Sequence, residues 1–191
     1  MIYTKNNQGT DETWKRIPSG SIGVELGVWK GGSSAKFLKN ASFLHLVDAW
    51  SIEPYKGSDE NGGWEGYLKK YSDLVVGSKD PNEFQKYYDG IYADVCKKFK
   101  DKPVKIWRMS TDKFFEQFDQ KVDWVYVDAA HSYEGCLYDL RKSLTIIKPG
   151  GSIFGDDYGN KKGVVRAVDE FIQETGLQLD NFYKNQIEIK V

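Results

Sequence analysis

Residues 21–39 read SIGVELGVWKGGSSAKFLK, and the turn within them, VELGVWKGGS at 24–33, decides the fold. The segment opens as a short apolar run, bends at glycines and continues with small residues that favour a helix start. We predict a buried strand at 21–26 and a helix over 33–39, with Ser33 or Ser34 as its cap. A strand that passes through glycines into a helix is typical of a parallel α/β sheet.

The same rhythm continues along the chain. Further apolar runs predict strands at 42–48, 104–109, 122–128 and 152–157. Helical spacing predicts helices at 11–16, 110–118, 133–148 and 162–176. The tail, LQLDNFYKNQIEIKV, alternates on both sides of a polar turn, which indicates a hairpin. The chain is therefore predicted to be a doubly wound α/β protein with helices on both faces of the sheet.

The glycine-rich turn carries the pattern E-x-G-x-x-x-G, from Glu25 through Gly27 to Gly31. Glycine lets the backbone pass close to a ligand because no Cβ is in the way. The pattern lacks the G-x-G-x-x-G spacing of a dinucleotide site. An acid just before the turn suits a cationic ligand with no phosphate at this spot, although a tight turn in another kind of α/β protein also fits.

Asp48 ends the next predicted strand, in HLVDAW, about twenty residues after the turn. A carboxylate at that place accepts hydrogen bonds from both ribose hydroxyls of a nucleoside. A helix cap or a solvated loop acid is the alternative.

Three more aspartates follow strand ends: Asp128 after the fourth strand, and Asp156 and Asp157 after the fifth. Ligands of open α/β sheets bind outside the carboxyl ends of the strands. Convergent carboxylates repel unless a cation is present, and they suit Mg²⁺, Mn²⁺ or Ca²⁺. We predict a metal site there. The alternative is that Asp156 and Asp157 are turn or cap residues.

His131 lies three residues after Asp128, in DAAHSY. Its imidazole is suited to accept a proton from a substrate hydroxyl. A metal ligand or a residue at a helix start are the other interpretations. His45 falls inside a predicted strand and is interpreted as structural.

Composition restricts the class of protein. The chain has 191 residues and a net charge of -1, so it fits one domain and shows no basic field for nucleic acid. The two cysteines make no CxxC pair, and no apolar stretch is long enough for a signal peptide or a membrane span. A cytoplasmic location is expected.

The predicted organisation is a polar lead-in at 1–20 followed by a single domain at 21–191. Residues 49–103 are rich in aromatics and too long for one crossover helix, so we predict a helical insertion or lid with a loop at 57–63. Its aromatics either pack the insertion onto the body or face a substrate. The basic run at 97–105 is interpreted as a solvated helix end.

Residues 20–191 resemble the class I S-adenosylmethionine-dependent methyltransferases. The resemblance is carried by VELGVWKGG, HLVDAW, the closing hairpin and, most specifically, the block DAAHSYEGCLYDLRKSLTIIKPGGSIFGDDY. Within that class the chain is similar to the metal-dependent macrocin-type sugar O-methyltransferases. It is shorter than typical antibiotic-sugar enzymes and has little N-terminal extension.

The resemblance implies a Rossmann-like, three-layer α/β/α fold with a seven-stranded, mostly parallel sheet and an antiparallel last strand. It implies that Asp48 binds ribose and that Ser110 and Thr111 lie near the adenine. The full set expected to line the cofactor is Glu25, Leu26, Gly27, Gly31, Ser33, Asp48, Ala49, Ser110, Thr111 and Asp128. Asp128, Asp156 and Asp157 would hold Mg²⁺, and His131, with Asp128, would serve catalysis.

The expected activity is transfer of a methyl group from S-adenosylmethionine to a hydroxyl of a sugar or other small molecule, without nucleic acid or membrane as partner. A homo-oligomer is one expected form. The alternatives are a cofactor-binding subunit without catalysis, or an N- or C-methyltransferase that needs no metal. The missing G-x-G-x-x-G speaks against a nicotinamide-dependent oxidoreductase.

Overall fold

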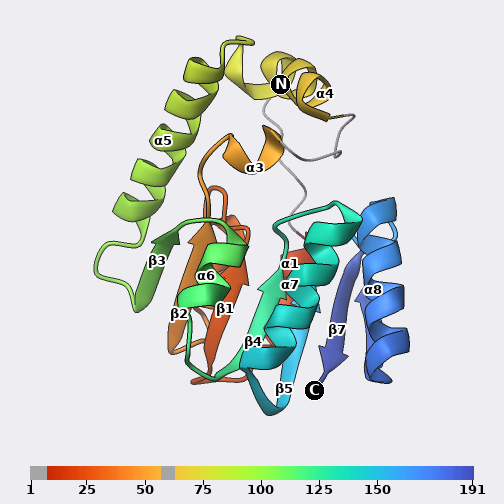
Figure 1. Cartoon of the computed structure of the whole chain (residues 1–191). Coiled ribbons are helices and arrows are strands. Elements are labelled where there is room, and N and C mark those ends of the chain that lie inside the picture. Colours follow the sequence, from red (N-terminus) through yellow and green to blue (C-terminus); the bar gives the residue numbers. More distant parts are fainter. Residues whose placement is uncertain (1–7, 57–62) are drawn as a thin grey trace.

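The computed structural model describes residues 8–56 and 63–191, and it contains a seven-stranded sheet in the order β3-β2-β1-β4-β5-β7-β6 (Figure 1). The strands are β1 (Ile22–Leu26), β2 (Phe43–Asp48), β3 (Val104–Arg108), β4 (Val122–Val127), β5 (Ile147–Gly155), β6 (Gln178–Tyr183) and β7 (Gln186–Lys190). The first five are parallel, and β7 runs antiparallel to both β5 and β6. The predicted fold class is confirmed.

Helices cover both faces of the sheet. The helices of the sheet body are α1 (Gln8–Arg16), α2 (Gly32–Phe37), α6 (Thr111–Gln117), α7 (Tyr133–Ile146) and α8 (Lys162–Thr175). Helices α6, α7 and α8 lie in front of the sheet in Figure 1 and share one core, with Phe114, Leu137 and Phe171 among its buried residues. A second core includes Phe37 of α2. These layers bury β2 and β4 on both sides, as their near-continuous apolar sequences predict.

The first strand–turn–helix unit differs in detail from the prediction. Helix α2 begins at Gly32 and ends at Phe37, and its N-cap is Gly31 rather than Ser33 or Ser34. Gly31 has φ 65°, a left-handed conformation that glycine adopts without strain. No side chain caps this helix. The tight turn leads into the helix at Gly32, so Ser33 and Ser34 already lie inside the helix and neither is at the cap position.

The predicted helix at 133–148 was also wrong at its end. Helix α7 stops at Ile146, and β5 starts at Ile147, which pairs with Val122 before a register shift. The PGG segment at 149–151 therefore lies within β5 instead of ending the helix. The strand ends at Gly155, so Asp156 and Asp157 follow it directly.

The segment between β2 and β3 forms α3 (Glu53–Lys56), α4 (Gly63–Tyr71), the π-helix η1 (Ser72–Val76) and α5 (Pro81–Lys98). These helices lie beyond the carboxyl ends of the strands (Figure 1). Tyr55 stacks on Tyr67 at 4.2 Å between ring centroids, and the hydroxyls of Tyr67 and Tyr88 lie 2.5 Å apart. These aromatics thus join α3, α4 and α5. The predicted loop at 57–63 lies, up to residue 62, outside the described residues.

Within residues 8–56 and 63–191, no helix has both the length and the apolar character needed to cross a membrane.

Candidate active site

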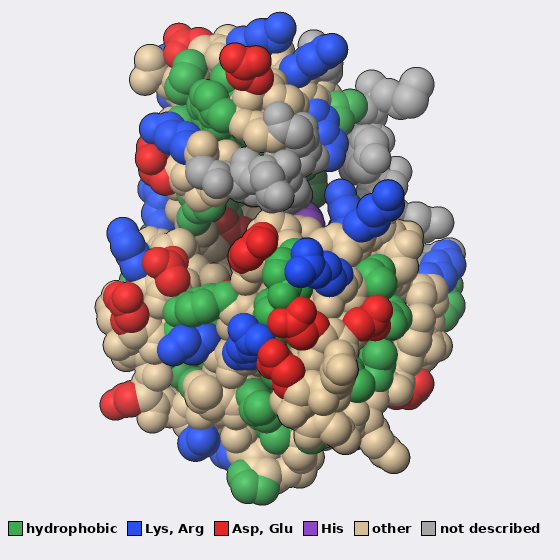
Figure 2. Space-filling view, turned by 45° about the vertical axis from the view of Figure 1, so that its right-hand side comes forward, with side chains coloured by type: hydrophobic (Ala, Val, Ile, Leu, Met, Phe, Trp, Pro, Cys, Tyr) green, Lys and Arg blue, Asp and Glu red, His purple; other side chains and the backbone are tan. Residues whose placement is uncertain are grey.

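The carboxyl ends of β1, β2, β4 and β5 meet at one edge of the sheet. Because β1 lies between β2 and β4, and β4 lies beside β5, the acids that follow these strands are brought to the same rim. The insertion stands over this rim, and the surface is hollowed where the two meet (Figure 2). The rim therefore holds the glycine-rich turn and the predicted acids together.

The turn at Gly27 has no room for a side chain. Gly27 has φ 89°, and a Cβ on it would lie 2.0 Å from the backbone oxygen of Asp128. The Gly27 N–H donates to the Val47 carbonyl at 2.9 Å, which fixes β1 against β2. Leu26 is fully buried, so only its backbone reaches the rim. The predicted need for glycine at this bend has a direct steric cause.

Asp48 holds the turn through its carboxylate. It accepts hydrogen bonds from the backbone N–H groups of Val28 at 3.1 Å, Trp29 at 2.8 Å and Trp50 at 2.7 Å. Burial raises the pKa of Asp48, and these three donors act in the opposite direction. The side chain is half-buried at the strand tip, where a carboxylate can accept further hydrogen bonds.

Two tryptophans missed by the sequence analysis complete this turn. Trp29 has φ 48° and Trp50 has φ 40°, a region that costs a non-glycine residue about 1–3 kcal/mol. The Trp50 indole N–H donates to the Trp29 carbonyl at 2.8 Å, and Trp50 is fully buried. The hydrogen bonds that Asp48 accepts from the backbone N–H groups of both residues offset the strain. An acid followed two residues later by a large aromatic was the signal available in the sequence.

Glu25 is buried beneath the turn, at 1% exposure. Burial raises the pKa of Glu25 to about 8, with nearby Asp128 and Asp48 acting in the same direction and Ser34 and Lys98 in the other. Among the described residues, none donates a hydrogen bond to its Oε2. A buried carboxylate oxygen without a partner fits a ligand that carries an ammonium group.

Asp128, His131 and Asp157 form a cluster beside the turn. One potential ligand atom from each of the three lies within 4.8 Å of the others. His131 Nε2 lies 3.3 Å from an oxygen of Asp157 and 3.6 Å from an oxygen of Asp128. Ser132, rather than His131, caps α7, since its hydroxyl accepts from the Gly135 N–H.

Asp156 does not belong to this group of three ligand atoms. Its Oδ1 accepts from the Asp157 N–H at 2.6 Å and from the side-chain amide of Asn185. Asp157 has φ 63°, and the same Asn185 amide also donates to its Oδ1 at 3.4 Å. The structure thus brings together two of the three predicted aspartates, with His131 in the third position.

This donor set fits a divalent cation. Two carboxylates suit Mg²⁺, Mn²⁺ or Ca²⁺, and an imidazole suits a transition metal better than Mg²⁺. Two carboxylates this close to each other repel, and a bound cation would relieve that repulsion. Asp128 and Asp157 are therefore the residues that would hold an ion, with His131 either as a third ligand or free to move a proton.

The other predicted cofactor residues lie on neighbouring segments. Ser33 is half-buried in α2, and Ala49 lies between Asp48 and Trp50. Ser110 is the N-cap of α6, and Thr111 is its first residue. The Thr111 hydroxyl lowers the pKa of the fully buried Asp139, which burial raises to about 7.

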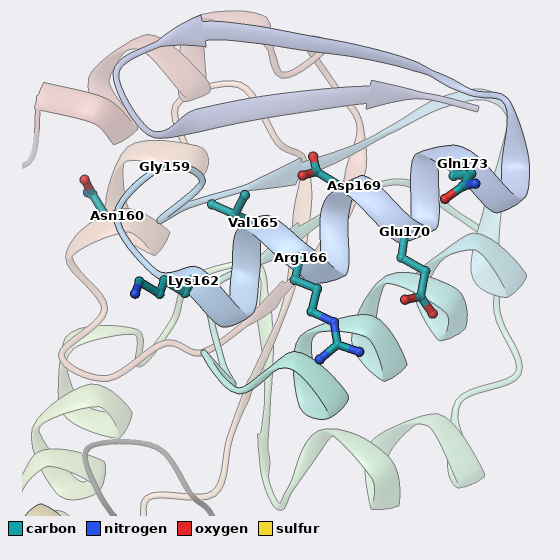
Figure 3. Close-up of a pocket in the computed structure, with 8 residues that line it drawn as sticks. All are labelled: Gly159, Asn160, Lys162, Val165, Arg166, Asp169, Glu170 and Gln173. Atoms are coloured by element: carbon teal, nitrogen blue, oxygen red, sulfur yellow. The ribbon is translucent and has the colours of Figure 1, made fainter.

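A separate hollow of about 630 Å³ lies along α8 (Figure 3). Its acidic side chains already have partners, because Tyr158 donates to Asp169 and Tyr133 donates to Glu170. Arg166 lies 3.7 Å over the Tyr133 ring. The hollow is larger than the space of about 10 Å³ beside Asp128 and His131, but it lacks a convergent reactive group. We place the chemistry at the carboxyl rim.

Comparison with known protein families identifies the domain. A family model described as a methyltransferase domain matches residues 24–158, from β1 through the acids after β5. The chain belongs to the methyltransferase domain family. As a member of this family, the chain is an S-adenosylmethionine-dependent methyltransferase, and the matched residues include the glycine-rich turn. Among curated proteins, none matches the sequence.

Solved structures share the methyltransferase fold at low sequence identity. SMU.1697c from Streptococcus mutans, in complex with SAH, has a TM-score of 0.58 at 13% identity, over 100% of this chain and 99% of that one. An rRNA methylase from Streptococcus thermophilus has a TM-score of 0.59 at 11% identity, over 100% and 98%. The O-methyltransferase NovP has a TM-score of 0.55 at 18% identity, over 96% and 76%.

Cofactor affinity should depend on pH through Glu25. Because burial raises the pKa of Glu25 to about 8, the free protein carries it protonated at pH 6. The ammonium group of the cofactor favours the ionised carboxylate. Binding of S-adenosylhomocysteine should therefore tighten from pH 6 to 7.5, by at most about tenfold per pH unit. Calorimetry at several pH values measures this.

The matched variant is Glu25→Gln, which keeps the shape of the side chain but cannot ionise. Its affinity should stay flat over the same pH interval. An affinity of the unaltered protein that does not change with pH contradicts this role of Glu25.

Proposed function

We propose that this methyltransferase methylates a hydroxyl oxygen on a sugar or another small molecule, with the assistance of a divalent cation. The observation that carries the proposal is the cluster of Asp128, His131 and Asp157 beside the glycine-rich turn. A methyl donor and a proton acceptor then lie on the same rim. Methylation of an alcohol needs both, because an alcohol is a poor nucleophile at neutral pH.

In the proposed reaction the acceptor oxygen attacks the methyl carbon, and the carbon–sulfur bond breaks. The sulfonium becomes a neutral thioether, and the proton of the hydroxyl must leave. In this proposal His131 takes that proton, and Asp157, 3.3 Å from its Nε2, stabilises the charged imidazole. The glycine-rich turn and Asp48 orient the donor, which supplies proximity. A bound divalent cation would lower the pKa of the acceptor hydroxyl and orient it.

Two alternatives define the tests. An N- or C-methyltransferase has no need of a cation at this cluster, and a cofactor-binding subunit would show no turnover. Nucleic acid as an acceptor is disfavoured by the net charge of -1 and by the acids on the rim. Turnover with a panel of hydroxylated small molecules, measured as S-adenosylhomocysteine release, distinguishes these alternatives.

Removal of metal should stop the reaction. A cation that activates the acceptor contributes several kcal/mol to the barrier, so EDTA should lower turnover by at least about 100-fold. Addition of Mg²⁺ or Mn²⁺ in excess should restore it. The same treatment should leave S-adenosylhomocysteine affinity unchanged, because Glu25 and Asp48 lie on other strands.

Asp157→Asn provides the matched variant, since it removes one charge from the cluster and keeps the side-chain volume. It should require more Mg²⁺ for half-maximal turnover. Full activity in EDTA would remove the metal from the proposal and favour the N- or C-methyltransferase.

A further inference from the structure

The last helix of the insertion touches the cofactor turn. Lys98, in the final turn of α5, donates from its ammonium group to the Gly31 carbonyl at 2.5 Å and to the Lys30 carbonyl at 3.2 Å. These two carbonyls belong to consecutive peptides at the exit of the glycine-rich turn. A residue 67 positions further along the chain therefore fixes the backbone at which the cofactor binds.

Phe99 strengthens the same contact. A Cβ placed on Gly31 would lie 2.5 Å from Cε2 of the Phe99 ring, and Phe99 is buried at 4% exposure. Gly31 stands at φ 65° as the N-cap of α2. The ring therefore packs directly on the peptide whose carbonyl Lys98 binds, and both restraints come from the end of α5.

The position of the ammonium also has an electrostatic consequence. Lys98 is the cation that acts on the buried Glu25, opposing the repulsion from Asp128 and Asp48. Burial lowers the pKa of Lys98, and the attraction of Glu25 partly reverses that effect. The ammonium is thus held by the carbonyls of the turn and attracted by Glu25.

We propose that Lys98 is a positioning residue for the cofactor, which holds the glycine-rich turn in its binding conformation through the carbonyls of Lys30 and Gly31. The insertion then has a role in donor binding as well as in covering the rim. The proposal rests on the S-adenosylmethionine-dependent activity of the family, and it holds for any acceptor, with or without a metal.

Lys98 would affect cofactor affinity by raising the fraction of molecules in which the turn has its binding-competent conformation. A trans peptide directs its C=O and N–H to opposite sides, so an anchored carbonyl also fixes the direction of the following N–H. Without the anchor the turn samples other conformations, and apparent affinity falls in proportion to the competent fraction. Because Lys98 is exposed, which weakens its interactions, we expect about a five- to tenfold loss of affinity.

The test compares Lys98→Met with Lys97→Met in the full-length protein, by calorimetry with S-adenosylhomocysteine and without acceptor. Both lysines lie in the last turn of α5 and have the same favourable interaction with the helix dipole. Only Lys98 reaches the turn. We expect weaker binding for Lys98→Met, unchanged binding for Lys97→Met, and recovery of most of the affinity in Lys98→Arg.

Thermal unfolding without ligand separates positioning from folding. Lys98→Met and Lys97→Met should unfold at similar temperatures, while S-adenosylhomocysteine should raise the midpoint less for Lys98→Met. Equal affinity of the two variants overturns the proposal, as does a Lys98→Met protein that unfolds far below Lys97→Met. A failure of the unaltered protein to bind S-adenosylhomocysteine would instead count against the assigned activity.

Discussion

Replacement of Asp48 by alanine should weaken binding of S-adenosylhomocysteine by about 100-fold or more. The carboxylate lies at the tip of β2 and is expected to accept hydrogen bonds from two ribose hydroxyls. Hydrogen bonds to a charged group contribute about 1.5–3 kcal/mol each, and two of them correspond to about 10²–10⁴ in affinity. The variant also loses the bonds to Val28, Trp29 and Trp50 that hold the strained turn. Calorimetry provides the measurement.

Two further variants show whether this loss is specific. Asp48→Asn keeps the volume of the side chain and one acceptor oxygen, so it should fold and bind with intermediate affinity. Asp123→Asn is the matched control at the opposite edge of the sheet, where Asp123 accepts the Ile22 N–H at 2.7 Å as β1 begins. It should bind S-adenosylhomocysteine normally. Normal binding by Asp48→Ala would contradict the role of Asp48 and leave it a structural carboxylate.

The features that the sequence predicted well depend on local patterns. Gly27 and Gly31 predict the turn from β1 into α2, because the backbone there is left-handed and other residues adopt that conformation only with strain. Asp48 follows from its place after an apolar run, since a strand that ends in an acid delivers that acid to the rim. The apolar runs were therefore enough to predict parallel strands whose carboxyl ends lie at one edge of the sheet.

Features that depend on contacts between distant segments could not be predicted. The start of β5 at Ile147 is set by its pairing with Val122, which overrides the helical spacing of the residues before it. Asp156 accepts a hydrogen bond from Asn185, which lies 29 residues further along the chain in the turn of the closing hairpin. Lys98 was interpreted as part of a solvated helix end, since nothing in the run at 97–105 shows which lysine faces the glycine-rich turn.

Replacement of His131 by alanine should lower turnover by about 10²–10⁴-fold, the usual contribution of a positioned base. Cofactor affinity should be unaffected, because His131 follows β4 whereas Glu25 and Asp48 belong to β1 and β2. The imidazole has its Nε2 3.3 Å from Asp157, so the variant loses both the proton acceptor and the partner of that carboxylate. Single-turnover methyl transfer at saturating S-adenosylmethionine measures the loss.

Measuring turnover over a range of Mg²⁺ concentrations distinguishes a base from a metal ligand at His131. If His131 is the base, turnover of His131→Ala stays low even at saturating Mg²⁺. If His131 is a metal ligand, a high Mg²⁺ concentration fills the weakened site and restores turnover. Ser132→Ala tests the helix-start interpretation, since it removes the cap of α7 and should cost about 0.5–2 kcal/mol of stability with little effect on turnover. Near-normal turnover of His131→Ala at low Mg²⁺ would contradict both chemical roles, because neither a missing base nor a weakened ion site leaves the rate unchanged there.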